Sequence, residues 1–129
     1  MIVADTSWIS ALRDSDDAHH TTAAASDRQI DDEPVIIAAV TLAECLVAPA
    51  RLGKIDAAEA ALRAAFEVEH PDDTAPRRWA VRRAATGLRL PDAVVLETAI
   101  HLDARGVATF DARLAQQCRS AGLAVIGPA

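Results

Sequence analysis

The feature that most restricts the fold is an unbroken apolar segment, Val35 to Val40, with the sequence VIIAAV. A strand that is apolar on both sides must be covered on both faces, and this arrangement is typical of parallel sheets with helices packed on either side. The polar residues 31–34 end in proline and separate this segment from the helical stretch before it. The segment therefore predicts a central parallel strand of an α/β protein.

Strand-like and helix-like segments alternate along the rest of the chain. Apolar stretches near residues 2, 107 and 124 predict three more strands, and residues 67–70 alternate like a short edge strand. Helical segments separate them, and this order favours a parallel sheet with crossover connections. We expect a single α/β domain over residues 1–129, a three-layer sandwich whose central, mainly parallel sheet is flanked by helices. A chain of 129 residues is long enough to bury one such core.

Four acidic side chains are predicted at the amino-terminal ends of helices, and three of them lie just past apolar strands. They are Asp5, Glu44, Asp92 and Asp111. Because the carboxyl ends of parallel strands meet at one edge of the sheet, we expect these carboxylates to share a crevice. Like charges at short range raise each other's pKa and oppose folding unless a cation shares the site. Oxygen ligands of this kind suit Mg²⁺, with Mn²⁺ as a possible substitute.

Helix capping is the competing explanation for each of these acids. Asp5 or the hydroxyls after it are suited to cap the first helix. Thr41 and Glu44 have the spacing of a capping box, in which a hydroxyl and a carboxylate satisfy two free amides. Asp92 follows a proline and Asp111 follows a strand, and either acid is a suitable cap for the helix that it begins. Both explanations stay open at the level of local sequence.

Positive charge gathers in the second part of the chain. The net charge is −6, but residues 1–74 have a balance of −10 and residues 75–129 a balance of +4. A helix predicted after Pro76 carries arginines around Trp79, with Arg78 and Arg82 on one face, and Arg89 follows this helix. A solvated helix face is the ordinary interpretation of such a stripe, and contact with phosphate groups is the alternative.

Carboxylates and arginines in this arrangement suit chemistry on a phosphodiester. A divalent ion held by carboxylates lowers the pKa of a bound water, orients the water for in-line attack and offsets the charge of the transition state. Phosphate reaches an acidic crevice only when the metal ion and nearby arginines offset the repulsion. The residues therefore favour metal-dependent hydrolysis of phosphodiesters.

The cysteines and histidines are expected to have structural roles. Cys45 and Cys118 have neither CxxC nor metal-site spacing, which predicts free core thiols. His19 and His20 are adjacent at a predicted helix start and point to different faces, so a shared metal is not expected. The amino terminus lacks a basic segment followed by an apolar run, and no apolar run has membrane length. We therefore expect a cytoplasmic protein without membrane contact.

Four short motifs follow one another in a fixed order along the chain. They are Asp-Thr-Ser at 5–7, Thr-x-x-Glu at 41–44, Leu-Pro-Asp-Ala at 90–93 and Thr-Phe-Asp-x-Arg-Leu at 109–114. Together they resemble the motif series of PIN-domain ribonucleases, and they are most similar to the VapC-type toxins of toxin-antitoxin pairs. The resemblance covers essentially the whole chain.

The resemblance implies a Mg²⁺-dependent endoribonuclease with defined residue roles. By resemblance, Asp5 and Asp92 would be metal ligands, while Glu44 and Asp111 would complete the site directly or through water. The hydroxyls of Ser7 and Thr109 would support the ligands. The basic stripe, independently of the resemblance, predicts Arg78, Arg82 and Arg89 as the residues that contact the RNA substrate. The same resemblance implies a homodimer and a VapB-like antitoxin whose tail covers the crevice, in a heterotetramer or a larger assembly.

The chain departs from this pattern around the fourth acid. Many relatives carry a polar residue before it and a second acid soon after it, whereas Phe110 precedes Asp111 here and Ala112 and Arg113 follow. The departure leaves open whether one or two metal ions bind.

Two other protein classes are compatible with parts of the sequence. A phosphorylated receiver domain has a similar acidic pocket, but it requires a lysine near the last strand, and Lys54, the only lysine, comes too early. A non-catalytic RNA- or partner-binding module on the same fold would keep the acids as caps. Asparagine replaces aspartate well as a cap but poorly as an anionic ligand. Asp5→Asn is therefore expected to abolish cleavage with little loss of stability.

Overall fold

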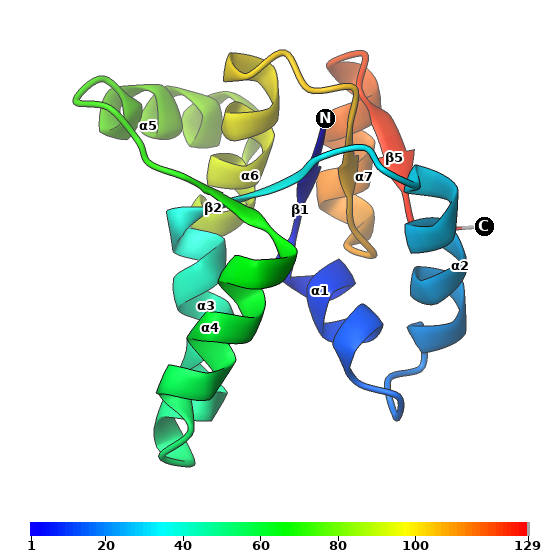
Figure 1. Cartoon of the computed structure of the whole chain (residues 1–129). Coiled ribbons are helices and arrows are strands. Elements are labelled where there is room, and N and C mark those ends of the chain that lie inside the picture. The colour runs from blue at the N-terminus through cyan, green and yellow to red at the C-terminus, as the bar shows by residue number, and fades with distance from the viewer. Residues whose placement is uncertain (129) are drawn as a thin grey trace.

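A five-stranded parallel sheet forms the centre of the molecule in the computed structural model, which describes residues 1–128 (Figure 1). Its strands are β1 (Ile2–Ala4), β2 (Val35–Ala38), β3 (Glu67–Glu69), β4 (Gly106–Ala108) and β5 (Ala124–Ile126). The helices are α1 (Thr6–Arg13), α2 (His20–Ile30), α3 (Ala39–Arg51), α4 (Ile55–Ala65), α5 (Ala75–Thr86), α6 (Leu90–His101) and α7 (Ala112–Ser120). The predicted α/β class and parallel sheet are confirmed. Ala129, the last residue of the predicted domain, lies outside the described residues.

Side chains of the central strand alternate between two apolar layers. Ile2 and Ala4 face a layer that includes Trp8 of α1 and residues of α2, α3 and α4. Val3 faces the opposite layer, which is built from α6, α7 and Val107 of β4. Helix α5 lies against α6, at the outside of this second layer (Figure 1). The alternation along three residues thus produces the three layers that the sequence predicts.

The strand order reverses at β1. The order across the sheet is β3-β2-β1-β4-β5, so the chain runs from β1 to one side first and later returns to the other side. In open parallel sheets, a crevice forms at such a reversal, beyond the carboxyl ends of the strands. Asp5 directly follows β1, between the start of α3 and the connection after β4. The topology therefore places Asp5 at the centre of the expected crevice.

The apolar segment 35–40 is a strand only in its first part. β2 stops at Ala38, which pairs with Glu69 of β3, and α3 begins with the next residue. A longer strand would have no partner on the other side, because β1 pairs with β2 only as far as Val3. Thr41 is consequently buried inside α3, and the predicted capping box is wrong.

Both cysteines are free thiols, as predicted. Cys118 is buried on α7 and Cys45 is half-buried on α3. Burial is the main cause that raises the pKa of Cys118 to about 12 and that of Cys45 to about 11. Neither thiol is therefore a ready nucleophile near neutral pH. None of the helices within residues 1–128 is both long enough and apolar enough to cross a bilayer.

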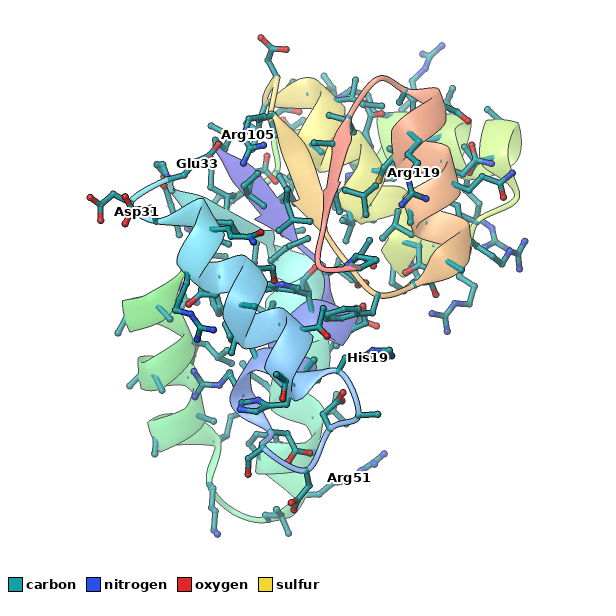
Figure 2. The ribbon with its side chains drawn as sticks, turned by 90° about the vertical axis from the view of Figure 1, so that its right-hand side faces the viewer. His19, Asp31, Glu33, Arg51, Arg105 and Arg119 are labelled. Atoms are coloured by element: carbon teal, nitrogen blue, oxygen red, sulfur yellow. The ribbon has the colours of Figure 1, made fainter. Side chains whose placement is uncertain are left out.

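An ion cluster at one end of the sheet joins the amino terminus to two connections. Glu33, which precedes β2, accepts a hydrogen bond of 2.7 Å from the Met1 amino group and one of 2.9 Å from the Arg105 guanidinium. Figure 2 shows Glu33 and Arg105 beside each other at the amino-terminal end of β1. The Arg105 hydrogen bond, followed by that of the amino group, lowers the pKa of Glu33 to about 2.

Candidate functional site

A cavity of about 240 Å³ opens beyond the carboxyl end of β1. The residues that line it are Asp5, Thr6, Ser7, Glu44, Arg89, Asp92 and Asp111. All four acids singled out in the sequence are among them, although they come from four separate parts of the chain. The structure therefore brings these carboxylates into one acidic crevice, the name used below for this cavity.

Asp5 is almost fully buried and is held by two hydroxyl groups. Its side chain is 5% exposed, and its Oδ2 accepts hydrogen bonds from Ser7 Oγ at 2.7 Å and from Thr109 Oγ1 at 2.6 Å. Although Asp5 occupies the N-cap position of α1, its side chain makes no capping hydrogen bond. The capping explanation is therefore wrong for Asp5, and capping does not account for the burial of its carboxylate.

The same two hydroxyls fix the connection that follows β4. Ser7 Oγ accepts a hydrogen bond of 3.0 Å from the backbone N–H of Phe110, and Thr109 Oγ1 accepts one of 3.0 Å from the N–H of Asp111. Each hydroxyl thus donates to Asp5 and accepts from the chain next to the fourth acid. This double use sets the position of Asp5 relative to the start of α7.

Asp92 lies in the first turn of α6 and faces into the crevice. The helix begins at Leu90 with Arg89 at the N-cap position, so the prediction that Asp92 caps this helix is wrong. The Asp92 side chain is 9% exposed, and its Oδ2 lies 3.4 Å from the Arg89 guanidinium. Burial raises the pKa of Asp92, the charges of Asp5 and Asp111 add to this effect, and Arg89 opposes it. The site crowds like charges and contains one cation.

Glu44 and Asp111 form the outer part of the crevice. Glu44 is exposed on the second turn of α3, and its Oε1 accepts a hydrogen bond of 3.0 Å from Thr6. Asp111 is half-buried, and its Oδ1 accepts a hydrogen bond of 2.9 Å from the N–H of Leu114. The cap predicted at Asp111 is thus confirmed, and it engages one carboxylate oxygen.

The predicted arginines do not gather at one place. Arg89 lines the crevice, and its side chain is 74% exposed. Arg78 and Arg82 of α5 instead form ion pairs of 3.6 and 2.9 Å with Glu97 of α6. Because Glu97 is only 6% exposed, its carboxylate requires such partners. These ion pairs give Arg78 and Arg82 a role in packing α5 against α6, and their contact with RNA stays a prediction.

Glu97 is the important residue that local sequence motifs did not single out. It is the only charged residue in the stretch 93–100, which is apolar apart from Glu97 and Thr98, and a charge in such a stretch is seldom buried without a partner. Arg78 and Arg82 are spaced to lie on one helix face. An acid inside an apolar helix, together with two arginines at this spacing on the preceding helix, was the available signal.

The carboxylates of the acidic crevice suit a divalent cation, but they do not form a complete set of ligands. Within residues 1–128, no three His, Cys, Asp or Glu side chains are grouped so as to hold an ion as they stand. Mg²⁺ retains several water molecules and commonly uses only one or two carboxylates, which Asp5 and Asp92 supply. The charge of Asp5 contributes to the raised pKa of Asp92, and a bound cation would offset this repulsion between like charges. The residues present therefore fit such an ion.

Comparisons with solved structures identify the same fold in several proteins. VapC20 from Mycobacterium tuberculosis, described as a Sarcin-Ricin loop cleaving toxin, is 24% identical with a TM-score of 0.72, and the match covers 96% of this chain and 97% of that one. A toxin-antitoxin complex from Klebsiella pneumoniae is 20% identical with a TM-score of 0.66, covering 86% and 87%. VapBC-1 from nontypeable Haemophilus influenzae is 18% identical with a TM-score of 0.68, covering 97% and 96%. These identities show a shared fold.

Sequence comparison provides the family assignment. No curated protein matches the chain. The sequence model of the PIN domain matches residues 2–120, a span that includes β1 to β4, all seven helices and the four acids of the crevice. Since this match extends over nearly the whole chain, the protein belongs to the PIN domain family.

Proposed function

We propose that this protein is a Mg²⁺-dependent endoribonuclease and the toxin of a toxin-antitoxin pair. The observation that carries the proposal is the acidic crevice, in which Asp5 and Asp92 are buried together at the reversal of the strand order. Membership of the PIN domain family supports it. So does the shared fold with a toxin described as cleaving the Sarcin-Ricin loop. The VapC-type assignment rests on this combination.

In this proposal, Asp5 and Asp92 would hold the ion, and Glu44 and Asp111 would complete the site directly or through water molecules. When bound, the ion activates a water for attack on the phosphodiester and offsets the charge that develops there. Ser7 and Thr109 act through Asp5, because their hydrogen bonds keep its carboxylate in one orientation. The exposed guanidinium of Arg89 is available to a phosphate of the RNA.

We propose a VapB-like antitoxin as the protein partner and a homodimer as the free form. The solved complex from Klebsiella pneumoniae, which shares the fold, is a toxin-antitoxin complex. A tail that covers the crevice would need positive charge to match its four carboxylates. Light scattering after size-exclusion chromatography, with and without the antitoxin, would measure the mass of each assembly, including a heterotetramer.

Cleavage of total cellular RNA tests the catalytic proposal. The purified protein is expected to produce discrete fragments with Mg²⁺ and none with EDTA, and Mn²⁺ is expected to replace Mg²⁺. Asp5→Asn and Asp92→Asn should each reduce cleavage at least about 100-fold, because the ion loses an anionic ligand. Asp103→Asn is the matched control, since Asp103 is exposed outside the crevice and has a φ of 53°, which asparagine tolerates.

The outcome also separates the enzyme from a binding module. If Asp5→Asn and Asp92→Asn cleave as well as the wild type, the four acids are not the catalytic site and the proposal fails. A protein that binds RNA equally with Mg²⁺ and EDTA and never cleaves it would be the non-catalytic module. Calorimetry with MgCl₂ alone measures ion binding independently of any RNA.

A further inference from the structure

A second cavity adjoins the acidic crevice and has a different chemical character. Its volume is about 430 Å³, and its lining includes His19, Phe110, Ala115 and Arg119. Asp111 lines both this cavity and the acidic crevice, so the two are neighbours on either side of one residue. Figure 2 shows His19 where α2 begins and Arg119 on α7, at the two ends of this region. We call it the aromatic cavity.

Two aromatic rings are stacked at this cavity. The ring centroids of His19 and Phe110 are 4.5 Å apart, and the ring planes differ by only 8°. Phe110 is half-buried and packs against the apolar core, whereas the His19 ring stacked on it is exposed. The exposed His19 ring, supported by Phe110, offers a flat surface of the kind on which unpaired nucleobases stack.

The other phenylalanine and the two tryptophans of the chain lie elsewhere. The chain has no tyrosine, two tryptophans and two phenylalanines. Trp8 and Phe66 are buried and pack edge to face in the core, and Trp79 lies on α5 away from this cavity. Within residues 1–128, the one aromatic stack with an exposed ring therefore lies at the cavity that shares Asp111 with the acidic crevice.

Hydrogen bonds through Ser7 fix the position of Phe110 relative to Asp5 in the acidic crevice. The N–H of Phe110 donates to Ser7 Oγ at 3.0 Å, and the same hydroxyl donates to Asp5 at 2.7 Å. A base on the aromatic stack would thus lie at a fixed position relative to Asp5. The exposed Arg119 provides a cation at the same cavity for the phosphate of that nucleotide.

We propose that the aromatic cavity is a subsite that binds one unpaired nucleobase of the RNA, next to the phosphodiester in the acidic crevice. The base stacks on the His19–Phe110 pair, and Arg119 contacts the adjoining phosphate. This inference rests on the proposed function, because it assigns RNA as the ligand. A subsite of this kind would favour single-stranded RNA over paired RNA, since a paired base cannot reach the rings.

A fluorescent base analogue tests the subsite without relying on cleavage. The probe is a short single-stranded RNA that contains 2-aminopurine, whose fluorescence is quenched when it stacks. All proteins carry Asp92→Asn, so that the probe is not consumed, and binding is measured with Mg²⁺. Adding His19→Ala should weaken binding roughly 5- to 150-fold and remove most of the quenching, because one stacked base is lost. Adding His19→Tyr should retain both.

Controls separate loss of the subsite from loss of the fold. His70→Ala removes another exposed histidine, at the opposite edge of the sheet, and should change neither affinity nor quenching. Phe110→Leu should behave like His19→Ala if circular dichroism shows that it is folded. If Phe110→Leu unfolds, the test rests on His19→Ala, which is not expected to disturb the fold because His19 is exposed.

The possible results distinguish this inference from the proposed function. If the wild-type protein cleaves RNA but His19→Ala leaves affinity and quenching unchanged, the subsite is wrong and the nuclease assignment stands. If quenching depends on His19 but the wild type never cleaves with Mg²⁺ or Mn²⁺, the base subsite stands on a binding module. If His19→Ala instead weakens binding only of the antitoxin, the cavity is a protein-binding site and the proposal is overturned.

Discussion

Two carboxylates define the site at the scale of single residues. Asp5 and Asp92 are both buried, yet each has its own partners: two hydroxyls for Asp5 and one exposed guanidinium for Asp92. Hydroxyl hydrogen bonds stabilise a carboxylate without cancelling its charge. The pKa of Asp92 is consequently raised, with burial as the first cause and Asp5 as the second. Repulsion between Asp5 and Asp92 therefore destabilises the folded protein when no cation is bound.

This repulsion predicts that removing one charge stabilises the ion-free protein. Asp92→Asn should raise the free energy of unfolding by up to about 1 kcal/mol in EDTA, the scale of one charge interaction at a partly solvated position. Arg89 loses its partner at little cost, because its side chain is 74% exposed. Mg²⁺ should raise the melting temperature of the wild type but not that of Asp92→Asn.

Thermal unfolding by circular dichroism, with MgCl₂ and with EDTA, provides the measurement. Asp103→Asn should follow the wild type in both solutions, because its charge is exposed and outside the crevice. A melting temperature of Asp92→Asn that is lower than that of the wild type in EDTA would contradict the repulsion argument.

At the scale of helices, α5 is fastened to α6 by charge as well as by apolar contact. Glu97 of α6 is nearly buried, and the guanidinium groups of Arg78 and Arg82 come to it from α5. Arg83 adds a hydrogen bond of 2.9 Å to the Leu88 carbonyl in the connection between the two helices. Arg78, Arg82 and Arg83 of α5 therefore have a structural role, because they bind α6 or the connection that leads to it.

Loss of Arg82 should affect stability rather than catalysis. Arg82→Ala removes the 2.9 Å partner of Glu97 and should lower the free energy of unfolding by about 1–3 kcal/mol. The value is below that of a fully buried pair, because the Arg82 side chain is 32% exposed and water screens part of the interaction. Urea unfolding measures this change.

Arg77→Ala on the same helix is the control, and it should change stability by less than about 0.5 kcal/mol because Arg77 is exposed. The cleavage rate per folded molecule should be the same for both variants. A loss of RNA affinity in Arg82→Ala with unchanged stability would restore the original interpretation of this arginine as an RNA contact.

The elements that sequence patterns predict well are those governed by local burial. The strands near residues 2, 36, 107 and 124 follow from apolar segments, and Gly87, with a φ of 71°, ends α5. Helix starts are less predictable. α3 begins before Thr41 and α6 before Asp92, because strand pairing and Pro91 decide these positions, and capping patterns do not.

Some features of the site are likewise predictable from the sequence, and others are not. A strand followed by an acid predicts that Asp5 and its counterparts meet, since this needs only the parallel order of the sheet. The hydrogen bonds of Ser7 and Thr109 to one oxygen of Asp5, and the stack of His19 on Phe110, join distant parts of the chain. No local pattern encodes such contacts, because they depend on how the elements pack.

At the scale of the whole molecule, the Glu33 cluster links acid stability to the chain's first residue. The pKa of Glu33, about 2, lies below the ordinary value of 4.5, so the ionised carboxylate is more favourable in the folded state than in the unfolded state. A lowered carboxylate pKa contributes stability above the unfolded-state value, and this contribution is lost as the pH falls from about 4.5 to about 2.

Glu33→Gln is therefore expected to be less stable than the wild type at pH 7, and the difference should vanish near pH 2. Urea unfolding at a series of pH values between 7 and 2 measures both effects. Glu67→Gln, a change at an exposed edge strand, should follow the wild type throughout. A constant difference between Glu33→Gln and the wild type down to pH 2 would show that the cluster does not stabilise through its charge.

The central place of β1 has a consequence for synthesis of the protein. Asp5 is made at the very start, but its hydroxyl partner Thr109 lies 104 positions later, and the fourth acid follows two residues after that. Both neighbours of β1 in the sheet are also made later than β1 itself. The four acids can therefore come together only after residue 111 has been synthesised. If this protein attacks RNA, the machinery that makes it is exposed to the completed crevice only after the last part of the domain has emerged.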